Sequence, residues 1–283
     1  MDKQDPHHVL SDDRIAHFYA DYAGIHDKDT LICHLETIRS RLGGENQARY
    51  KCIDRFNFAY SRLATRFYYP RVLAIGKQAK AKNESALLLD IGCCTGTDLR
   101  HLLWNGYPGA DLIGTDISCH YIECGYDLFQ DKSSFPGTFV TGDLFDPAML
   151  SQTHTEGGLN PYRHRVRIVY TGSVIHLLRS VERTREFIQR VTMLLQPGGL
   201  FVGTHVAANR TTTVYRPVPG HAKQYLGMDV FREALVEAGF VDIEMQMEDR
   251  TPDPYDPKED DDFRAFWLSF CAIYRPQTTA TLE

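Results

Sequence analysis

The spacing of apolar residues changes near residue 80 and predicts two different kinds of structure on either side. Before that point apolar residues recur at helical spacing, as in Phe18, Tyr19 and Tyr22. The helices expected there span 14–22, 30–42, 50–66 and 71–80. The pattern therefore predicts a helical cap over residues 1–80, followed by a second domain over residues 81–278.

From Leu87 onward, short apolar runs alternate with helical stretches, which is typical of a mostly parallel sheet with right-handed crossovers. No helical pattern separates the last two apolar runs, so their strands are expected to pair antiparallel. The expected strands, seven in all, span 87–91, 111–116, 138–141, 166–171, 200–205, 241–247 and 265–274.

The turn after the first of these strands is suited to hold a ligand, because open α/β sheets bind ligands beyond the carboxyl ends of their strands. The run reads Leu-Leu-Leu-Asp-Ile-Gly-Cys-Cys-Thr-Gly-Thr-Asp. A dinucleotide fingerprint requires glycine at the first, third and sixth positions of the turn, but Cys94 and Thr97 follow Gly92 at the last two. The spacing fits a different pattern, acid-x-Gly-x-small-x-Gly, which begins at Asp90 and ends at Gly96.

Acidic residues end three successive predicted strands. Asp116 lies 26 residues after Asp90 and can accept hydrogen bonds from both hydroxyls of a ribose. Asp143, with Leu144 and Phe145, follows the third strand, where side chain and backbone can recognise an adenine edge. A single acid at such a place is a common turn residue. Three in this order favour a ligand that carries an ammonium and a sulfonium over one that carries phosphates.

These residues, with Pro-Gly-Gly at 197–199, make residues 86–275 resemble class I S-adenosylmethionine-dependent methyltransferases. Four short matches narrow the resemblance to fungal O-methyltransferases of meroterpenoid pathways. They are Asp-Tyr-Ala-Gly-Ile at 21–25, Asp-Ile-Gly-Cys-Cys-x-Gly-Thr-Asp at 90–98, Gly-Asp-Leu-Phe-Asp-Pro at 142–147 and Gly-Ser-x-x-His-Leu at 172–177. The cysteine in place of a motif glycine is usual in that family.

The resemblance implies an α/β fold with a Rossmann-like seven-stranded sheet, mostly parallel with an antiparallel last strand, and S-adenosyl-L-methionine as cofactor. It also implies esterification of a carboxyl group on a farnesylated aromatic acid. One departure concerns the acceptor, because the family tends to show Gly-Arg-Gln-Val-Gly where this chain has Gly-Thr-His-Val-Ala at 203–207. The predicted cofactor-binding residues are Asp90, Gly92, Cys93, Gly96, Asp116, Ile117, Asp143, Leu144, Phe145 and Thr171.

Methyl transfer needs chiefly alignment of the reacting atoms, and orientation alone can supply roughly 7–11 kcal/mol. A carboxylate acceptor needs no base, whereas a phenol would gain about 10²–10⁴-fold from one. His176, five residues past the fourth strand, is the candidate catalytic residue, since it can donate to a carboxylate or accept a phenolic proton. A histidine in this place equally often bonds only a neighbouring carbonyl.

Three further residues are candidates for substrate binding. His205 ends the fifth strand at the same sheet edge. Tyr19 and Tyr22 form an aromatic stripe that can line an apolar pocket if the helical cap over residues 1–80 is a substrate lid. Ordinary core packing explains that stripe equally well. The histidines show no paired spacing with acids of the zinc-hydrolase kind, so no metal site is predicted.

Charge and composition restrict the partners of this 283-residue chain. Its net charge is −6 with no long basic run, which predicts no nucleic-acid partner. Seven scattered cysteines predict a cytoplasmic protein, and the absence of a long apolar run predicts that it does not insert into a membrane. The expected partner is a small-molecule substrate, and a homodimer is compatible with the sequence.

The predicted function is therefore an O-methyltransferase that esterifies a carboxylate of a small apolar intermediate. Three alternatives remain open: a methyltransferase-fold cyclase that does not consume the cofactor, a C- or phenol O-methyltransferase, and a catalytically silent binding protein. Fold alone does not decide among them.

Overall fold

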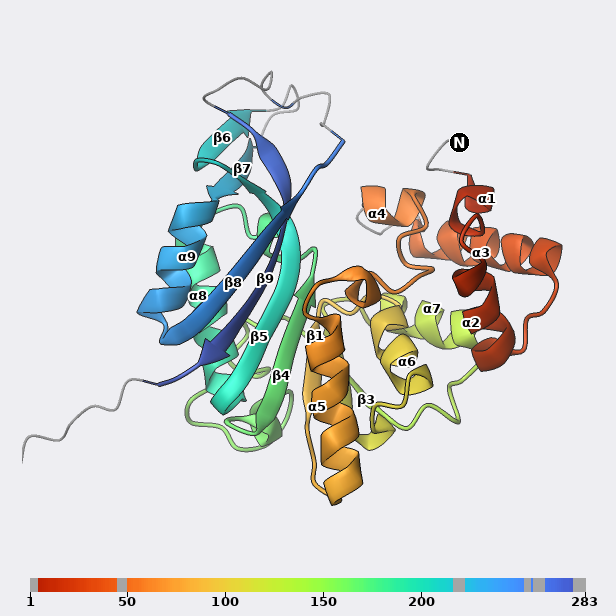
Figure 1. The fold of residues 1–283 in the computed structure, drawn as a ribbon, viewed down its shortest axis with the longest axis horizontal. Coiled ribbons are helices and arrows are strands. Elements are labelled where there is room, and N and C mark those ends of the chain that lie inside the picture. The colour runs from red at the N-terminus through yellow and green to blue at the C-terminus, as the bar shows by residue number, and fades with distance from the viewer. Residues whose placement is uncertain (1–4, 45–49, 216–221, 252–255, 257–262, 277–283) are drawn as a thin grey trace, which may run out of the picture. The chain divides into compact units, whose positions relative to one another are not determined.

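The structure, a computed structural model, describes residues 5–44, 50–215, 222–251, 256 and 263–276 (Figure 1). It divides into two compact units. The first combines residues 1–86 with 92–142, and the second combines residues 87–91 with 143–283. The N-terminal residues therefore share a unit with the turn and helices that follow the first strand.

The N-terminal part of the first unit is helical, as predicted, and the first three of its helices begin at aspartate side chains. Asp12 accepts a hydrogen bond from the N–H of Arg14, and Asp27 accepts one from the N–H of Thr30, which satisfies otherwise unpaired groups. The helices are α1 (Pro6–Val9), α2 (Asp13–Ala23), α3 (Lys28–Leu42), α4 (Lys51–Asp54) and α5 (Tyr69–Lys82), with the short turn η1 (Leu63–Thr65) before α5.

The prediction of one continuous helix over 50–66 is wrong. Helix α4 ends at Asp54, and Phe56 has a φ of 55°, a left-handed conformation that stops a helix. The carbonyls of Phe58 and Ala59 accept hydrogen bonds from side chains elsewhere in the unit. These contacts need a non-helical backbone, which the apolar spacing of the segment does not reveal.

The rest of the first unit alternates helices with two parallel strands. In order, these elements are α6 (Thr97–Trp104), η2 (Gly109–Asp111), β2 (Leu112–Asp116), α7 (Cys119–Phe129) and β3 (Thr138–Thr141). Strands β2 and β3 pair from Ile113 and Thr138 to Asp116 and Thr141.

The aromatic stripe of α2 lies in the core of this unit. Tyr19 is 0% exposed and its ring stacks on Phe129 of α7 at 5.5 Å between centroids. Its hydroxyl donates to the carbonyl of Ala59 at 2.8 Å. On α3, Nε2 of His34 bonds the carbonyl of Leu128 at 3.0 Å. Tyr19 thus packs in the core, and its contact with a substrate stays a prediction.

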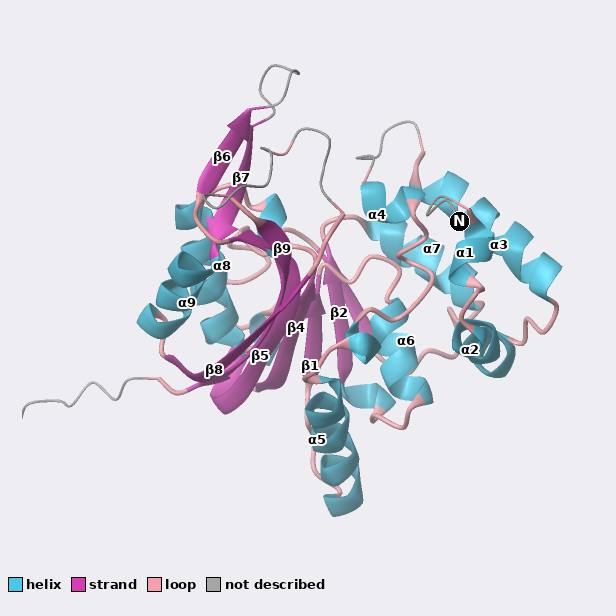
Figure 2. Cartoon of the chain, turned by 45° about the horizontal axis from the view of Figure 1, so that its top comes forward, coloured by secondary structure: helices cyan, strands magenta, loops and turns pink. Residues whose placement is uncertain are grey.

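The second unit contains most of the sheet. Strands β1 (Leu88–Ile91), β4 (Val166–Gly172) and β5 (Leu195–Ala208) pair in parallel. Strand β9 (Ala265–Tyr274) pairs antiparallel with β5 and with β8 (Phe240–Glu248). Helices α8 (Val181–Leu194) and α9 (Met228–Glu237) cover one face of these strands (Figures 1 and 2). Two short turns, η3 (Asn160–Tyr162) and η4 (Ile175–Leu177), flank β4.

The α/β fold with mostly parallel strands and antiparallel C-terminal strands is confirmed. Among the described residues, the structure adds two strands to the seven predicted, β6 (Thr212–Tyr215) and β7 (Ala222–Gly227). They form an antiparallel hairpin, and β7 also pairs in parallel with β5 between Ala207 and Leu226. The pattern missed them because both strands are short and mix polar with apolar residues, and the segment between them lies outside the described residues.

Candidate active site

The loop at residues 92–96, here called the cofactor loop, lies between β1 and α6. The N–H groups of Gly92 and Cys93 both donate to the carbonyl of Thr115, at 2.8 and 3.0 Å, which ties the loop to β2. Gly92 and Gly96 have φ values of 77° and 65°, in the region that glycine adopts most easily. A Cβ on Gly96 would lie 2.7 Å from the guanidinium of Arg100, so no larger residue fits there.

Asp116, the last residue of β2, holds the other side of this loop. Its carboxylate accepts hydrogen bonds from the N–H of Cys94 at 2.9 Å and from the N–H of Ser118 at 3.0 Å. Burial raises the pKa of Asp116, against the effect of these backbone hydrogen bonds. A carboxylate has about four lone-pair positions, so these backbone hydrogen bonds leave Asp116 the capacity to accept from a ribose hydroxyl. The carboxylate of Asp116 therefore fits the ribose of the predicted cofactor. The side chain of the neighbouring Ile117 is 69% exposed, which suits contact with an adenine ring.

The segment after β3 begins within hydrogen-bonding distance of Asp116. The N–H of Gly142 donates to the carbonyl of Asp116 at 3.0 Å. In the second unit, Asp143 accepts a hydrogen bond from the N–H of Phe145 at 2.9 Å and so forms a tight turn. The carbonyl of Leu144 accepts from Arg190 of α8 at 2.9 Å. The predicted adenine-reading residues are thus held by α8.

Two more predicted cofactor residues lie on strands of the second unit. Asp90 is 2% exposed within β1 and pairs in register with Tyr170 of β4. The hydroxyl of Thr171 donates to the carbonyl of Ile91 at 3.1 Å, which braces the carboxyl end of β1. The cofactor roles of all these residues stay predictions that their places in the fold support.

His176 lies in η4, directly after β4, and is half-buried. Its Nδ1 accepts a hydrogen bond from the N–H of Val206 on β5 at 3.4 Å. The edge of its ring meets Trp267 of β9, with 6.0 Å between centroids. Trp267 packs beside Val206 and Tyr225, so His176 borders an apolar surface on this unit.

His205 lies in a different environment from His176, although both were predicted to meet the substrate. Its side chain is 0% exposed and packs against Phe231 of α9, at 4.6 Å between centroids, and against Phe270. Burial lowers the pKa of His205 to about 4, although its Nδ1–H donates to the carbonyl of Val206. Successive side chains of a strand point to opposite faces. His205 therefore faces α9, away from the side of Val206, and its substrate contact stays a prediction.

Sequence reasoning missed three groups beside these candidates. Arg100 is fully buried under the cofactor loop, the Phe58 carbonyl bonds two threonine hydroxyls near it, and Trp267 flanks His176. Only Arg100 has a signal in the sequence, as a cation on the otherwise apolar stripe of α6.

The described residues contain no group of histidine, cysteine or acidic side chains placed to hold a metal. Within the same part of the chain, no helix has the length and apolarity needed to cross a membrane.

Comparisons with known proteins show which family the chain resembles in sequence. A family model described as mRNA (guanine-N(7))-methyltransferase domain matches residues 68–235. The chain is similar to O-methyltransferase phiE of Fungal sp. (strain ATCC 74256), with 33% identity over 54% of this chain and 48% of that protein. It is also similar to methyltransferase adrK of Penicillium roqueforti, with 33% identity over 56% of this chain and 52% of that protein. The matched part thus spans about half the length of these curated relatives.

Among solved structures, the Burkholderia thailandensis 1,6-didemethyltoxoflavin-N1-methyltransferase aligns over 89% of this chain and 90% of its own, with a TM-score of 0.49 and 14% identity. The family match covers more than half of the chain. On that match, the chain belongs to the methyltransferase family that this domain defines.

Proposed function

We propose that this enzyme esterifies a carboxylate of a small, largely apolar acid, with farnesylated aromatic acids as the substrate class. Curated relatives named O-methyltransferases support transfer to oxygen. The observation that carries the choice of a carboxylate is the hydrogen bond that His176 accepts from the backbone of β5.

This hydrogen bond favours one tautomer of the neutral imidazole. Nδ1 of His176 accepts from the N–H of Val206, so Nε2 carries the hydrogen and is a donor. A donor can hold a carboxylate oxygen in line, but it cannot remove the proton of a phenol. A carboxylate is already ionised at neutral pH and needs no base, so this tautomer suits it.

The surface beside His176 matches an apolar acid. Trp267 and Val206 belong to a cluster with Tyr225, Phe263 and Ala265 on the second unit. An apolar wall next to one polar donor is the usual composition of a small-molecule site. In this scheme His176 orients the acceptor carboxylate and Trp267 shields it from water.

The bound cofactor supplies an activated methyl group on a sulfonium. In the proposed site Asp116 binds the ribose hydroxyls, and the glycines of the cofactor loop let the backbone approach the cofactor closely. The protein's contribution is then orientation, with no proton to be removed from the acceptor.

The test is mass spectrometry with methyl-labelled S-adenosylmethionine. The panel contains farnesylated aromatic acids, their methyl esters, their phenol-blocked analogues and an mRNA cap analogue. We expect label on the free and phenol-blocked acids and none on the esters. Label only on acids with a free phenol, or on the cap analogue, would refute carboxyl transfer. A product of unchanged mass would instead establish the cyclase alternative.

The activity of two His176 variants on the same substrates gives a second test. The variant His176→Gln keeps a hydrogen-bond donor but removes the imidazole base, and His176→Leu removes both. If His176 only orients a carboxylate, the glutamine variant retains more activity than the leucine variant. An equal loss of about 10²–10⁴-fold in both variants would indicate a general base and contradict the proposal.

A further inference from the structure

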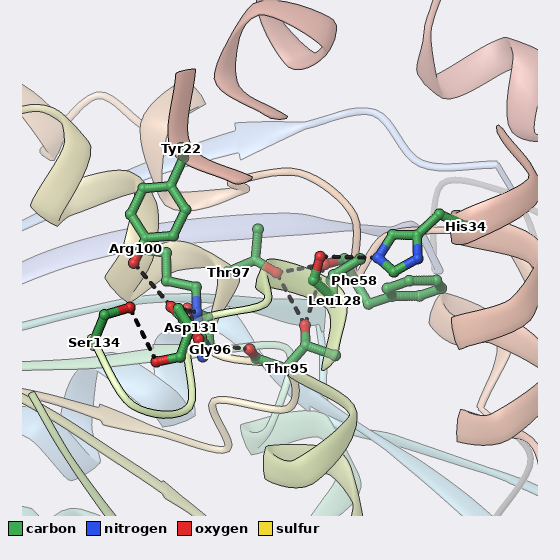
Figure 3. Close-up of polar contacts among 10 residues, drawn as sticks. All are labelled: Tyr22, His34, Phe58, Thr95, Gly96, Thr97, Arg100, Leu128, Asp131 and Ser134. Carbon is green, nitrogen blue, oxygen red and sulfur yellow. Dashed lines mark hydrogen bonds and ion pairs between the residues drawn. The ribbon is translucent and has the colours of Figure 1, made fainter. Parts of the chain in front are cut away.

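Arg100 is the largest fully buried side chain of the described residues, and all three of its guanidinium nitrogens have partners (Figure 3). Nε and Nη2 each donate to one oxygen of Asp131, both at 2.7 Å, in a bidentate pair. Nη1 donates to the carbonyl of Thr95 in the cofactor loop at 2.8 Å. One cation therefore links α6, the chain after α7 and the loop.

The surroundings of this cation are apolar. Four aromatic rings lie 4.8–5.5 Å from the guanidinium carbon, those of Tyr126, Phe129, Phe135 and Phe139. Asp131 is itself only 5% exposed. Hydrogen bonds of a desolvated ion pair hold their geometry more firmly than exposed ones, because water does not compete for the partners.

An N-terminal helix completes the network. The hydroxyl of Tyr22 on α2 donates to the same oxygen of Asp131 that accepts from Nε of Arg100, at 2.9 Å. Burial and the neighbouring carboxylate raise the pKa of Tyr22, which keeps its hydroxyl protonated as a donor. The polar chain thus runs from α2 through Asp131 and Arg100 to Thr95, as Figure 3 shows.

The direction of the Thr95 carbonyl affects the conformation of the whole cofactor loop. Because the peptide unit is planar, the direction of this carbonyl also fixes the N–H of Gly96. That N–H donates to the carbonyl of Cys93 at 2.7 Å and closes the turn. The same turn directs the N–H of Cys94 to Asp116. Rotation of the Thr95 peptide would therefore disturb both sides of the predicted ribose site.

We propose that Arg100 is a positioning residue for the cofactor loop, and that Tyr22 of α2 strengthens its hold. Cofactor affinity then depends on a residue of the N-terminal helices that touches no cofactor. The inference rests on the proposed role of the cofactor loop and Asp116 in binding.

The test measures binding of S-adenosylhomocysteine by calorimetry and thermal unfolding on the same samples of the full chain. Breaking one partner of a buried ion pair can unfold a protein, whereas neutralising both is often tolerated. The main variant therefore combines Arg100→Met with Asp131→Asn, and the milder one is Tyr22→Phe. The control is Tyr107→Phe, which removes a tyrosine hydroxyl that bonds a group outside this network, the backbone carbonyl of Ala86 at 2.6 Å.

We expect the double variant to bind at least ~10-fold more weakly and Tyr22→Phe about 3-fold more weakly, each a loss the size of one hydrogen bond. Tyr107→Phe should lower the melting temperature as much as Tyr22→Phe without weakening binding. Wild-type affinity in both the double variant and Tyr22→Phe would overturn the inference. If the double variant does not fold, equal affinities of Tyr22→Phe and Tyr107→Phe would overturn it.

A separate variant distinguishes this failure from failure of the proposed site. Asp116→Asn should weaken binding about 10–100-fold, because hydrogen bonds to a charged acceptor contribute about 1.5–3 kcal/mol each. Unchanged binding of Asp116→Asn would refute the cofactor site itself. Weak binding of Asp116→Asn with unchanged binding of the Arg100 and Tyr22 variants would refute only the positioning role.

Discussion

The buried imidazole of His205 should make the stability of the protein depend on pH. Burial lowers its pKa from 6.5 to about 4, so the folded protein keeps the ring neutral. Below about pH 6.5 the unfolded chain binds a proton that the folded protein does not bind, and the free energy of unfolding falls as pH decreases. The group's contribution is complete above about pH 6.5 and is lost between there and about pH 4.

The size of this loss follows from the two pKa values. Linkage gives a loss of about 2 kcal/mol at pH 5 and about 3 kcal/mol at pH 4, both to order of magnitude. His205 is 0% exposed, so solvent does not screen the effect. Its Nε2 also has no hydrogen-bond partner among the described residues, which leaves the ring no anion to stabilise a proton.

The measurement is urea unfolding of the wild type and of His205→Asn from about pH 4 to pH 7.5, a range centred on the group's titration. Asparagine can still donate to the carbonyl of Val206 but does not titrate. The variant should be less stable near pH 7.5, through lost packing against Phe231, and the difference should shrink by about 2 kcal/mol at pH 5. A difference that stays constant with pH would show that His205 titrates normally and refute the reasoning.

Two further predictions concern the supports of the cofactor loop. In Gly125→Ala the new Cβ would lie 2.2 Å from the Thr95 carbonyl, so we expect about 1–3 kcal/mol of destabilisation, by urea unfolding, together with weaker S-adenosylhomocysteine binding. Gly76→Ala, which meets only an aromatic side chain, should destabilise without that loss of binding. Asp98→Ala should free the 61–63 segment, which Asp98 holds through two hydrogen bonds, and make this segment cleavable by limited proteolysis.

Most of the sheet could be predicted from sequence because its strands are short apolar runs separated by glycine, proline or helical stretches. The strands at 138–141 and 166–171 were placed within a residue of β3 and β4. The hairpin of β6 and β7 was missed, since its strands carry no continuous apolar run. The broken helix at 50–66 was missed for another reason: apolar spacing describes which face is buried, and it says nothing of carbonyls that must be turned toward distant hydroxyls.

The candidate site also has a part that the sequence predicts and a part that it does not. Asp116 was placed by its distance in sequence from Asp90, because the order of strands and turns is local information. The network around Arg100 joins α2, the cofactor loop and the chain after α7, and its partners lie up to 109 residues apart in sequence. No single segment of the sequence contains all the residues of this network, so only the folded chain reveals it.

The same contacts change how the N-terminal residues relate to the cofactor loop. A hinged cover would be joined to its site by contacts that break easily. Here the hydroxyls of Thr95 and Thr97, 1% and 5% exposed, both bond the carbonyl of Phe58, at 3.2 and 2.5 Å. Lifting that carbonyl away would remove an acceptor that both buried hydroxyls share and leave them only the hydrogen bond to each other, at 2.9 Å. The donor left without an acceptor would cost about 1–3 kcal/mol. Residues 58–63 are therefore energetically part of the loop's support.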